Sequence, residues 1–176
     1  MAYFDTTTLL SSAQAITTTA DATTVYDTCG VGAGTAPTMI GAGGVNTAMG
    51  FDIGAGDGAA VPELFATVTT AGTGAGTITI SVSAAPDNGS YSAGTYTVLA
   101  STQAFVGTAL TVGRQIKLTI PPFPQLNSAG ATVLPRFYKV TYTVSGSATA
   151  SFTTGIILNA PDGRTAQIYG SNFVAV

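Results

Sequence analysis

The sequence contains no histidine and no tryptophan, and it has a single cysteine, Cys29. Histidine is the side chain that most often moves protons or activates a nucleophile near neutral pH, and zinc sites are built mainly from cysteine and histidine. Acid–base catalysis, an imidazole-activated cysteine and a zinc centre are therefore all disfavoured. A lone cysteine forms no disulfide within the chain, and we expect Cys29 to be a small, buried thiol.

Charge is also scarce. Charged residues make up 7% of the 176 residues, against about 25% in an ordinary soluble domain. A surface with few charges is easily desolvated and repels its own copies weakly, which favours a chain that works packed against other protein. A secreted β-domain with a hydroxyl-rich coat is the alternative interpretation. The net charge of −3 offers no basic patch for nucleic acid, and no apolar run is long enough to span a bilayer.

The few charges are unevenly distributed along the chain. Every basic residue follows residue 113, whereas every acidic residue except Asp162 precedes residue 88. The bases are Arg114, Lys117, Arg136, Lys139 and Arg164. This separation predicts that an acidic region of one copy meets a basic region of another.

The residues that replace charge are threonine, serine, alanine and glycine, with 22 glycines and 8 prolines. Threonine favours strands, while glycine and proline end them. Alternation is clearest over residues 63–70, 77–83, 95–100, 114–120 and 136–144, with shorter strands expected at 37–40, 49–53 and 167–169. Eight to ten strands joined by turns predict an all-β antiparallel sandwich, with a jelly roll favoured.

The faces of these strands can be assigned from the same alternation. In 136–144 the apolar face carries Tyr138, Val140, Tyr142 and Val144, and in 95–100 Tyr96 and Val98 share one face. Residues 1–22 are expected to form an extended N-terminal arm, and 23–176 a single sandwich domain with a proline-rich loop at 121–135. Removing residues 1–12 should then leave the domain folded.

The N-terminal sequence MAYFDTTTLLSSAQAI lacks a basic region and has Asp5 where a signal peptide needs apolar residues. This indicates that the protein is not exported through the general secretory route. Assembly in a cytoplasm is favoured instead.

Three patterns suggest sites, and each has a simpler explanation. Asp52 and Glu63 have the spacing of the first and twelfth positions of a calcium loop, but glycines occupy the third and fifth positions. The glycine clusters lack a complete phosphate-binding motif and are expected to be turns. Several aromatics are candidates for a sugar platform, although packing explains them better: Tyr91, Tyr96, Tyr138, Tyr142, Phe123 and Phe152. No catalytic residue, cofactor or metal is predicted.

Three blocks taken together carry a resemblance to a known family. They are FDTTTLLSSAQAITTTADATTVYDT, FDIGAGDGAAVPELFATVTTAGTGAGTITISVSAAPDNGSYS and LPRFYKVTYTVSGSATASFTTGIIL. Their order resembles that in the capsid cement (decoration) proteins of tailed bacteriophages, from about residue 4 to residue 160. The segments 30–48 and 121–135 depart from the usual pattern.

The resemblance implies a non-enzymatic β-sandwich protein made in the host bacterial cytoplasm. It would sit on the outer capsid surface as a homo-dimer or homo-trimer and bridge neighbouring copies of the major capsid protein. Apolar residues without a clear place in the core are the candidate contacts, or else they cap the open ends of the sandwich: Tyr3, Phe4, Leu9, Leu10, Phe123, Leu126, Tyr169, Phe173 and Val174. A tail or fibre component and a carbohydrate-binding β-domain remain as alternatives.

Overall fold

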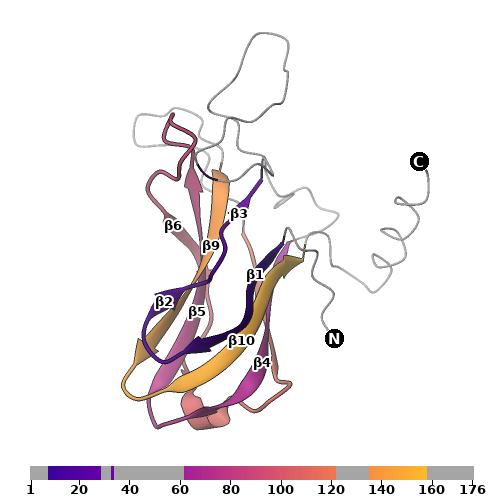
Figure 1. Ribbon diagram of the computed structural model, residues 1–176, viewed down its shortest axis with the longest axis vertical. Coiled ribbons are helices and arrows are strands. Elements are labelled where there is room, and N and C mark those ends of the chain that lie inside the picture. Colours follow the sequence, from indigo (N-terminus) through magenta and orange to yellow (C-terminus); the bar gives the residue numbers. More distant parts are fainter. Residues whose placement is uncertain (1–7, 29–32, 34–61, 122–134, 158–176) are drawn as a thin grey trace, which may run out of the picture.

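The chain folds into two facing antiparallel sheets (Figure 1). The structure is a computed structural model that describes residues 8–28, 33, 62–121 and 135–157. Its strands are β1 (Leu9–Ile16), β2 (Ala20–Asp21), β3 (Tyr26–Asp27), β4 (Glu63–Thr73), β5 (Thr77–Pro86), β6 (Thr97–Ser101), β7 (Phe105–Val106), β8 (Gln115–Thr119), β9 (Pro135–Ser145) and β10 (Thr149–Ile157), with one 3-10 turn, η1 (Gly107–Ala109). The prediction of an all-β antiparallel sandwich is confirmed.

The strand pairing is nested. Sheet A has the order β1-β10-β4-β8, and sheet B has the order β2-β9-β5-β6, with β3 also on β9 and β7 also on β5. Among the described strands, β1 thus pairs with β10, and both β2 and β3 pair with β9. Nearer the middle of the chain, β4 pairs with β8 and β5 pairs with β6. This pairing places strands that are far apart in the sequence side by side.

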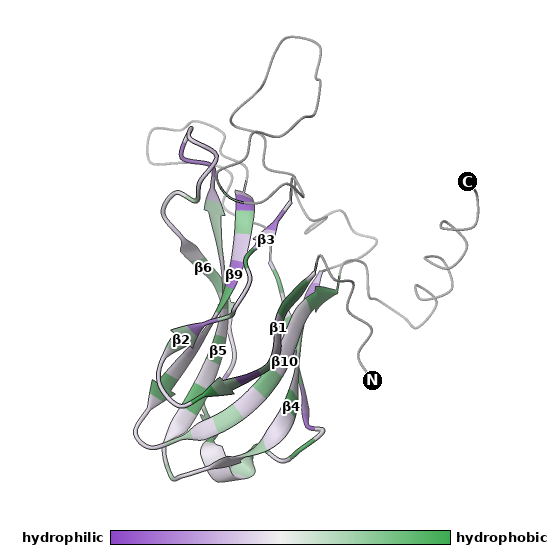
Figure 2. Cartoon of the chain, viewed as in Figure 1, coloured by the Kyte–Doolittle hydropathy of each residue, from purple (hydrophilic) through white to green (hydrophobic). Residues whose placement is uncertain are grey.

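The hydrophobic core lies between the two sheets and follows the alternation of the sequence. Tyr138, Val140 and Tyr142 of β9 are buried against Ile78 and Ile80 of β5 and their neighbours. Bands of hydrophobic and weakly polar residues alternate along β10, and strongly hydrophilic residues are sparse (Figure 2). The predicted faces of these long strands are therefore confirmed.

One predicted face points outward. Tyr96 and Val98 were expected to share one face of the strand, and Val98 is 62% exposed. The register shifts between Val82 and Ser83, so that Ala100 pairs with Val82 while Val98 pairs with Ser83. β6 therefore has one extra residue between Val98 and Ala100. An extra residue turns the side chains beyond it to the opposite face of the sheet, and the local sequence pattern does not predict where it occurs.

The predicted arm is also wrong over its second half. Residues 9–16 form β1 at the edge of sheet A, and Leu10 and Ile16 belong to the core. Two register shifts and a positive φ at Ala13 interrupt the alternation of β1, which is why the sequence looked only weakly strand-like there. Removing residues 1–12 would delete the buried Leu10, so that truncation is not expected to leave the domain intact.

A hydroxyl cluster links the two sheets inside the core. The Tyr142 hydroxyl of sheet B lies 2.8 Å from the Ser11 hydroxyl of β1 and donates to the Thr154 hydroxyl of β10 at 2.7 Å. All three side chains are buried. Burial raises the pKa of Tyr142 above its ordinary value, and the hydrogen bonds to Ser11 and Thr154 only partly oppose this.

The turns at one end of the sandwich are packed closely enough to require glycine. Gly74, between β4 and β5, has φ +83°, and a Cβ there would lie 1.6 Å from the Ser147 carbonyl oxygen of the β9–β10 turn. The predicted glycine turn at this position is confirmed, and its glycine also makes room for the neighbouring hairpin.

Gly74→Ala should destabilise the protein more than Gly89→Ala. Both glycines have a φ near +85°, but no atom lies within 4 Å of a Cβ at Gly89. Gly89→Ala should therefore cost only the left-handed strain of about 1–2 kcal/mol. Gly74→Ala should add an overpacking cost of about 1–3 kcal/mol. Urea unfolding of both variants measures the difference, and equal losses would contradict the close packing at Gly74.

Tyr142→Phe should lower the free energy of unfolding at pH 7 by about 1–3 kcal/mol, because two buried hydroxyls lose their partner. Because the folded-state pKa is raised, the contribution of Tyr142 is complete below the ordinary tyrosine pKa of about 10 and is lost as the pH rises through the folded value. The variant should thus lose less stability than the wild type in alkali. Unfolding curves from pH 7 to 11 test this, with Tyr96→Phe as the less buried control. Parallel alkaline losses in wild type and Tyr142→Phe would refute it.

Candidate functional site

The described strand ends that border the undescribed segments lie at one end of the sandwich. In sheet A, Glu63 at the start of β4 pairs with Ile157 and Thr119 at the ends of β10 and β8. In sheet B, the start of β9 lies beside the ends of β3 and β5. Short turns at 74–76 and 146–148 join the sheets at the opposite end, so these two sets of strand ends lie together. We call this the loop end and define it by the described residues Thr8, Thr28, Pro62, Pro121, Pro135 and Ile157.

The predicted contact residues are either at the loop end or in segments that continue from it along the chain. Tyr3, Phe4, Phe123, Leu126, Tyr169, Phe173 and Val174 lie outside the described residues. The segments that contain them adjoin Thr8, Pro121 and Ile157, all at the loop end. Of the two predicted residues that are described, Leu9 is half-buried and Leu10 is fully buried in the core. The prediction of Leu10 as a partner contact is therefore wrong, because its side chain lies in the core.

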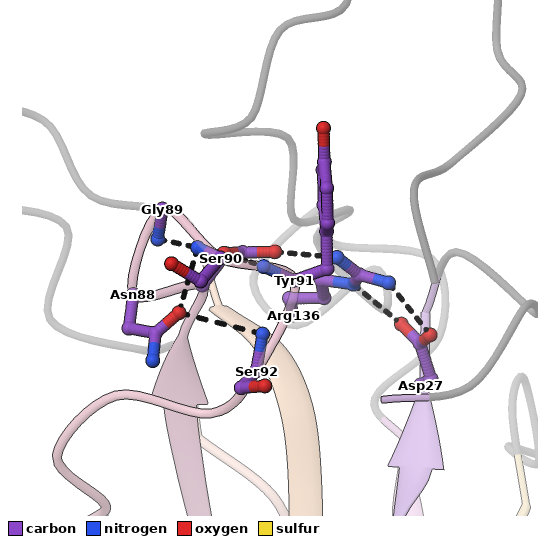
Figure 3. A network of polar contacts seen from close by, with 8 residues as sticks. Asp27, Asn88, Gly89, Ser90, Tyr91, Ser92 and Arg136 are labelled. Atoms are coloured by element: carbon purple, nitrogen blue, oxygen red, sulfur yellow. Dashed lines mark hydrogen bonds and ion pairs between the residues drawn. The ribbon is translucent and has the colours of Figure 1, made fainter. Parts of the chain in front are cut away.

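A buried ion network fixes the described part of the loop end. The Arg136 guanidinium donates to both carboxylate oxygens of Asp27, at 3.0 and 3.1 Å, and also to Asp87 (Figure 3). The side chains are only 1%, 7% and 1% exposed, respectively. The guanidinium carbon also lies 4.7 Å from the centre of the Phe137 ring. One arginine thus ties β9 to the end of β3 and to the residue that follows β5.

Asp87 also organises the turn between β5 and β6. Asp87 accepts hydrogen bonds from the backbone N–H groups of Gly89 and Tyr91, and Asn88 accepts from those of Ser90 and Ser92. In a tight turn these backbone N–H groups have no backbone carbonyl to bond, and the Asp87 and Asn88 side chains accept their hydrogen bonds instead. Tyr91 in this turn has φ +61°. Figure 3 shows this turn on one side of Arg136 and Asp27 on the other.

A second, exposed cluster lies on the outer face of sheet B. Asp21 accepts hydrogen bonds from Lys139 at 2.9 Å and from the Thr141 hydroxyl, and the Lys139 ammonium lies 4.5 Å from the centre of the Tyr96 ring. Burial alone would raise the pKa of Asp21, but Thr141 and Lys139 hold it below its ordinary value. Burial, followed by the charge of Asp21, raises the pKa of Tyr96.

Sequence reasoning missed these intramolecular pairs. The separation of acids from bases predicted contact between copies, whereas Asp21, Asp27 and Asp87 meet Lys139 and Arg136 of the same chain. Nested pairing brings the first acidic strands beside β9, more than a hundred residues later. The sequence held one indirect signal, an arginine on the side of the strand that Tyr138, Val140 and Tyr142 make apolar, but nothing in it identified the partners.

The structure describes only some of the other residues that the sequence singled out. Tyr138, Tyr142 and Phe152 are buried, as packing predicted, while Tyr91 and Tyr96 are half-buried. Phe123, Cys29, Asp52 and the strands expected at 37–40, 49–53 and 167–169 lie outside the described residues, and Glu63 is the first residue of β4. Within the described ranges, no three metal-ligating side chains of the His, Cys, Asp or Glu type gather into a possible ion site. No helix in those ranges has the length and apolar character needed to cross a membrane.

The fold defines a small antiparallel β-sandwich protein whose described part carries a structural ion network. The sequence model of the Bbp16 family matches residues 10–157, from the second residue of β1 to the last residue of β10. The chain belongs to the Bbp16 family. Comparison with curated proteins gave no match.

Arg136→Met should lower the free energy of unfolding by about 3–5 kcal/mol, because it leaves two buried carboxylates without their cation. Lys139→Met is the matched control, since its pair with Asp21 is exposed (23% and 49%) and such pairs contribute about 0–1 kcal/mol. Chemical denaturation at pH 7 compares the two. Similar losses in both variants would show that the Arg136 network does not hold the loop end together.

Proposed function

We propose that this protein is a capsid cement (decoration) protein of a tailed bacteriophage. In this role it binds the outer surface of the capsid and bridges neighbouring major capsid subunits, acts without catalysis, and is made in the cytoplasm of the host bacterium. The observation that carries the proposal is the loop end, where the segments holding the predicted contact residues adjoin a rigid sandwich.

The rest of the described surface supports a protein that is covered by other protein. The outward residues of β5 and β9 are largely hydroxyls, including Thr79, Ser81, Thr141 and Thr143. Hydroxyl side chains are desolvated at far lower cost than charges. Two of the described bases, Arg136 and Lys139, already have carboxylate partners in the chain, so binding to a capsid would not have to strip water from them.

The mechanism would be multivalent. Capsid subunits separate by sliding apart, and a bridging protein adds contacts that must break first. Once one segment at the loop end binds a subunit, the others search only the nearby shell, so their effective concentration is high. The sandwich acts as the rigid spacer that keeps these segments together. A homo-dimer or homo-trimer would multiply the same effect.

One observation bears on the alternative functions. A glycan platform needs exposed aromatic rings, and the large hydrophobic side chains that are exposed among the described residues are all valines: Val25, Val98, Val106 and Val112. This disfavours a carbohydrate-binding role for the described surface. A tail or fibre component has the same composition and is separated from a cement protein by the experiment below.

Wild-type protein should co-sediment with shells of its cognate major capsid protein and saturate at a ratio set by the symmetry of the shell. The double variant Tyr3→Ala/Phe4→Ala should bind several-fold more weakly, because it loses apolar contacts of a segment at the loop end. Val112→Ala is the matched control: Val112 is 64% exposed, but it lies near η1 at the opposite end. Folded wild-type protein that fails to bind shells would refute the proposal, and equal binding by the double variant would remove the N-terminal segment from the contact.

A further inference from the structure

The edges of the two sheets differ in how they are protected. An open edge exposes unpaired backbone groups and invites another strand, so proteins blunt it with bulges or very short strands. β1 has two register shifts, β6 has one, and β2, β3 and β7 each have two residues. The Gln14 side chain also joins β1 to the β2–β3 segment through Asp21 and Thr23. Among the described edge strands, β8 is the longest that pairs without any register shift.

The backbone of β8 is oriented for strand addition. Ile120 donates to the Pro62 carbonyl, and Val68 donates to the Arg114 carbonyl. These bonds mark the even-numbered residues of β8 as the ones that face β4 in the ladder. The N–H and C=O groups of Gln115, Lys117 and Thr119 therefore point away from β4, toward the open side. The side chains of these three residues are exposed.

The charges on β8 and on the residue before it are positive. Arg114 and Lys117 are the described bases with no carboxylate of the described chain in ion-pair contact. Arg114 donates to the Ala109 carbonyl and lies over the Phe105 ring. The Lys117 ammonium lies 5.7 Å from the centre of the Phe65 ring on β4. Lys117 thus leans over sheet A, and no described strand pairs with the other side of β8.

These features discriminate between possible occupants. A second copy that added its own β8 in antiparallel register about Lys117 would place one lysine opposite another, and directly opposed like charges destabilise a pair of strands. A strand with a carboxylate opposite Lys117 would gain charge complementarity as well as the backbone hydrogen bonds. The edge therefore favours an acidic extended segment over its own symmetry mate.

We propose that the open edge of β8 receives an extended, carboxylate-bearing segment of a neighbouring major capsid subunit, which continues sheet A as a fifth strand. The identity of this partner rests on the proposed function, whereas the site itself rests on the geometry and charge of β8. Hydrogen bonds to Gln115, Lys117 and Thr119 would supply affinity, and the cation of Lys117 would select an acidic strand.

Two pairs of variants test this in the full-length protein with capsid shells as the probe. Gln115→Pro removes an outward N–H at the first residue of the strand, where proline is tolerated, while Gln115→Ala keeps it. Lys117→Glu reverses the charge, while Lys117→Arg keeps it. Gln115→Pro and Lys117→Glu should each weaken shell binding about tenfold or more, and both controls should bind within about twofold of wild type. Thermal melting of each variant confirms that the sandwich is folded.

Hydrogen exchange gives an independent readout. On shell binding, the amides of Gln115, Lys117 and Thr119 should become protected, whereas those of the bulged edge at 97–101 should not. Wild-type binding without this protection, and with all four variants unchanged, would overturn the β8 site and leave the cement function standing. Failure of the wild type to bind shells would overturn the function and the partner together. Protection of Lys117 and Thr119 in concentrated protein without shells, lost in Gln115→Pro, would identify a second copy as the occupant and overturn the proposal as stated.

Discussion

Arg136 carries a full positive charge into a place where almost no water reaches it, and this constraint organises the loop end. A buried guanidinium is tolerated only when carboxylates and further hydrogen bonds surround it. Asp27 and Asp87 provide these from two other elements, so the ends of β3, β5 and β9 must meet in one geometry. Asp87 then builds the turn that follows β5. The geometry of the loop end thus depends on one ion network.

The two ends of the sandwich are stabilised by different means. At the loop end, buried charges and side-chain hydrogen bonds hold the strand ends. At the opposite end, glycines such as Gly74 allow turns to pack against one another almost without space between them. Between the two ends, the Tyr142 hydroxyl joins the sheets through Ser11 and Thr154. The result is a stiff body with little charge on its outer faces, a suitable spacer for a protein that bridges others.

In the proposed role, the sandwich would contact the capsid through two regions that share no residues, the loop end and the edge of β8. The segments at the loop end would provide several weak contacts that act together. The edge of β8 would provide a backbone-directed contact, selected by the charge of Lys117. The other edges among the described strands are bulged or short, so within the described part of the chain a partner strand has one regular place to add. A protein with these features can bind strongly while exposing few groups that would bind the wrong partner.

The sequence by itself determined the class of fold and the inward faces of the long strands, because alternation in β4, β5 and β9 is a local property with a period of two. It could not determine the partners of Arg136, the outward turn of Val98, or the place of Leu10 in the core. Those depend on which distant strands pair and where a register shifts, and nested pairing joins residues more than a hundred positions apart. The open edge of β8 was equally hidden, because whether a strand is central or at an edge is decided only when the whole sheet has assembled.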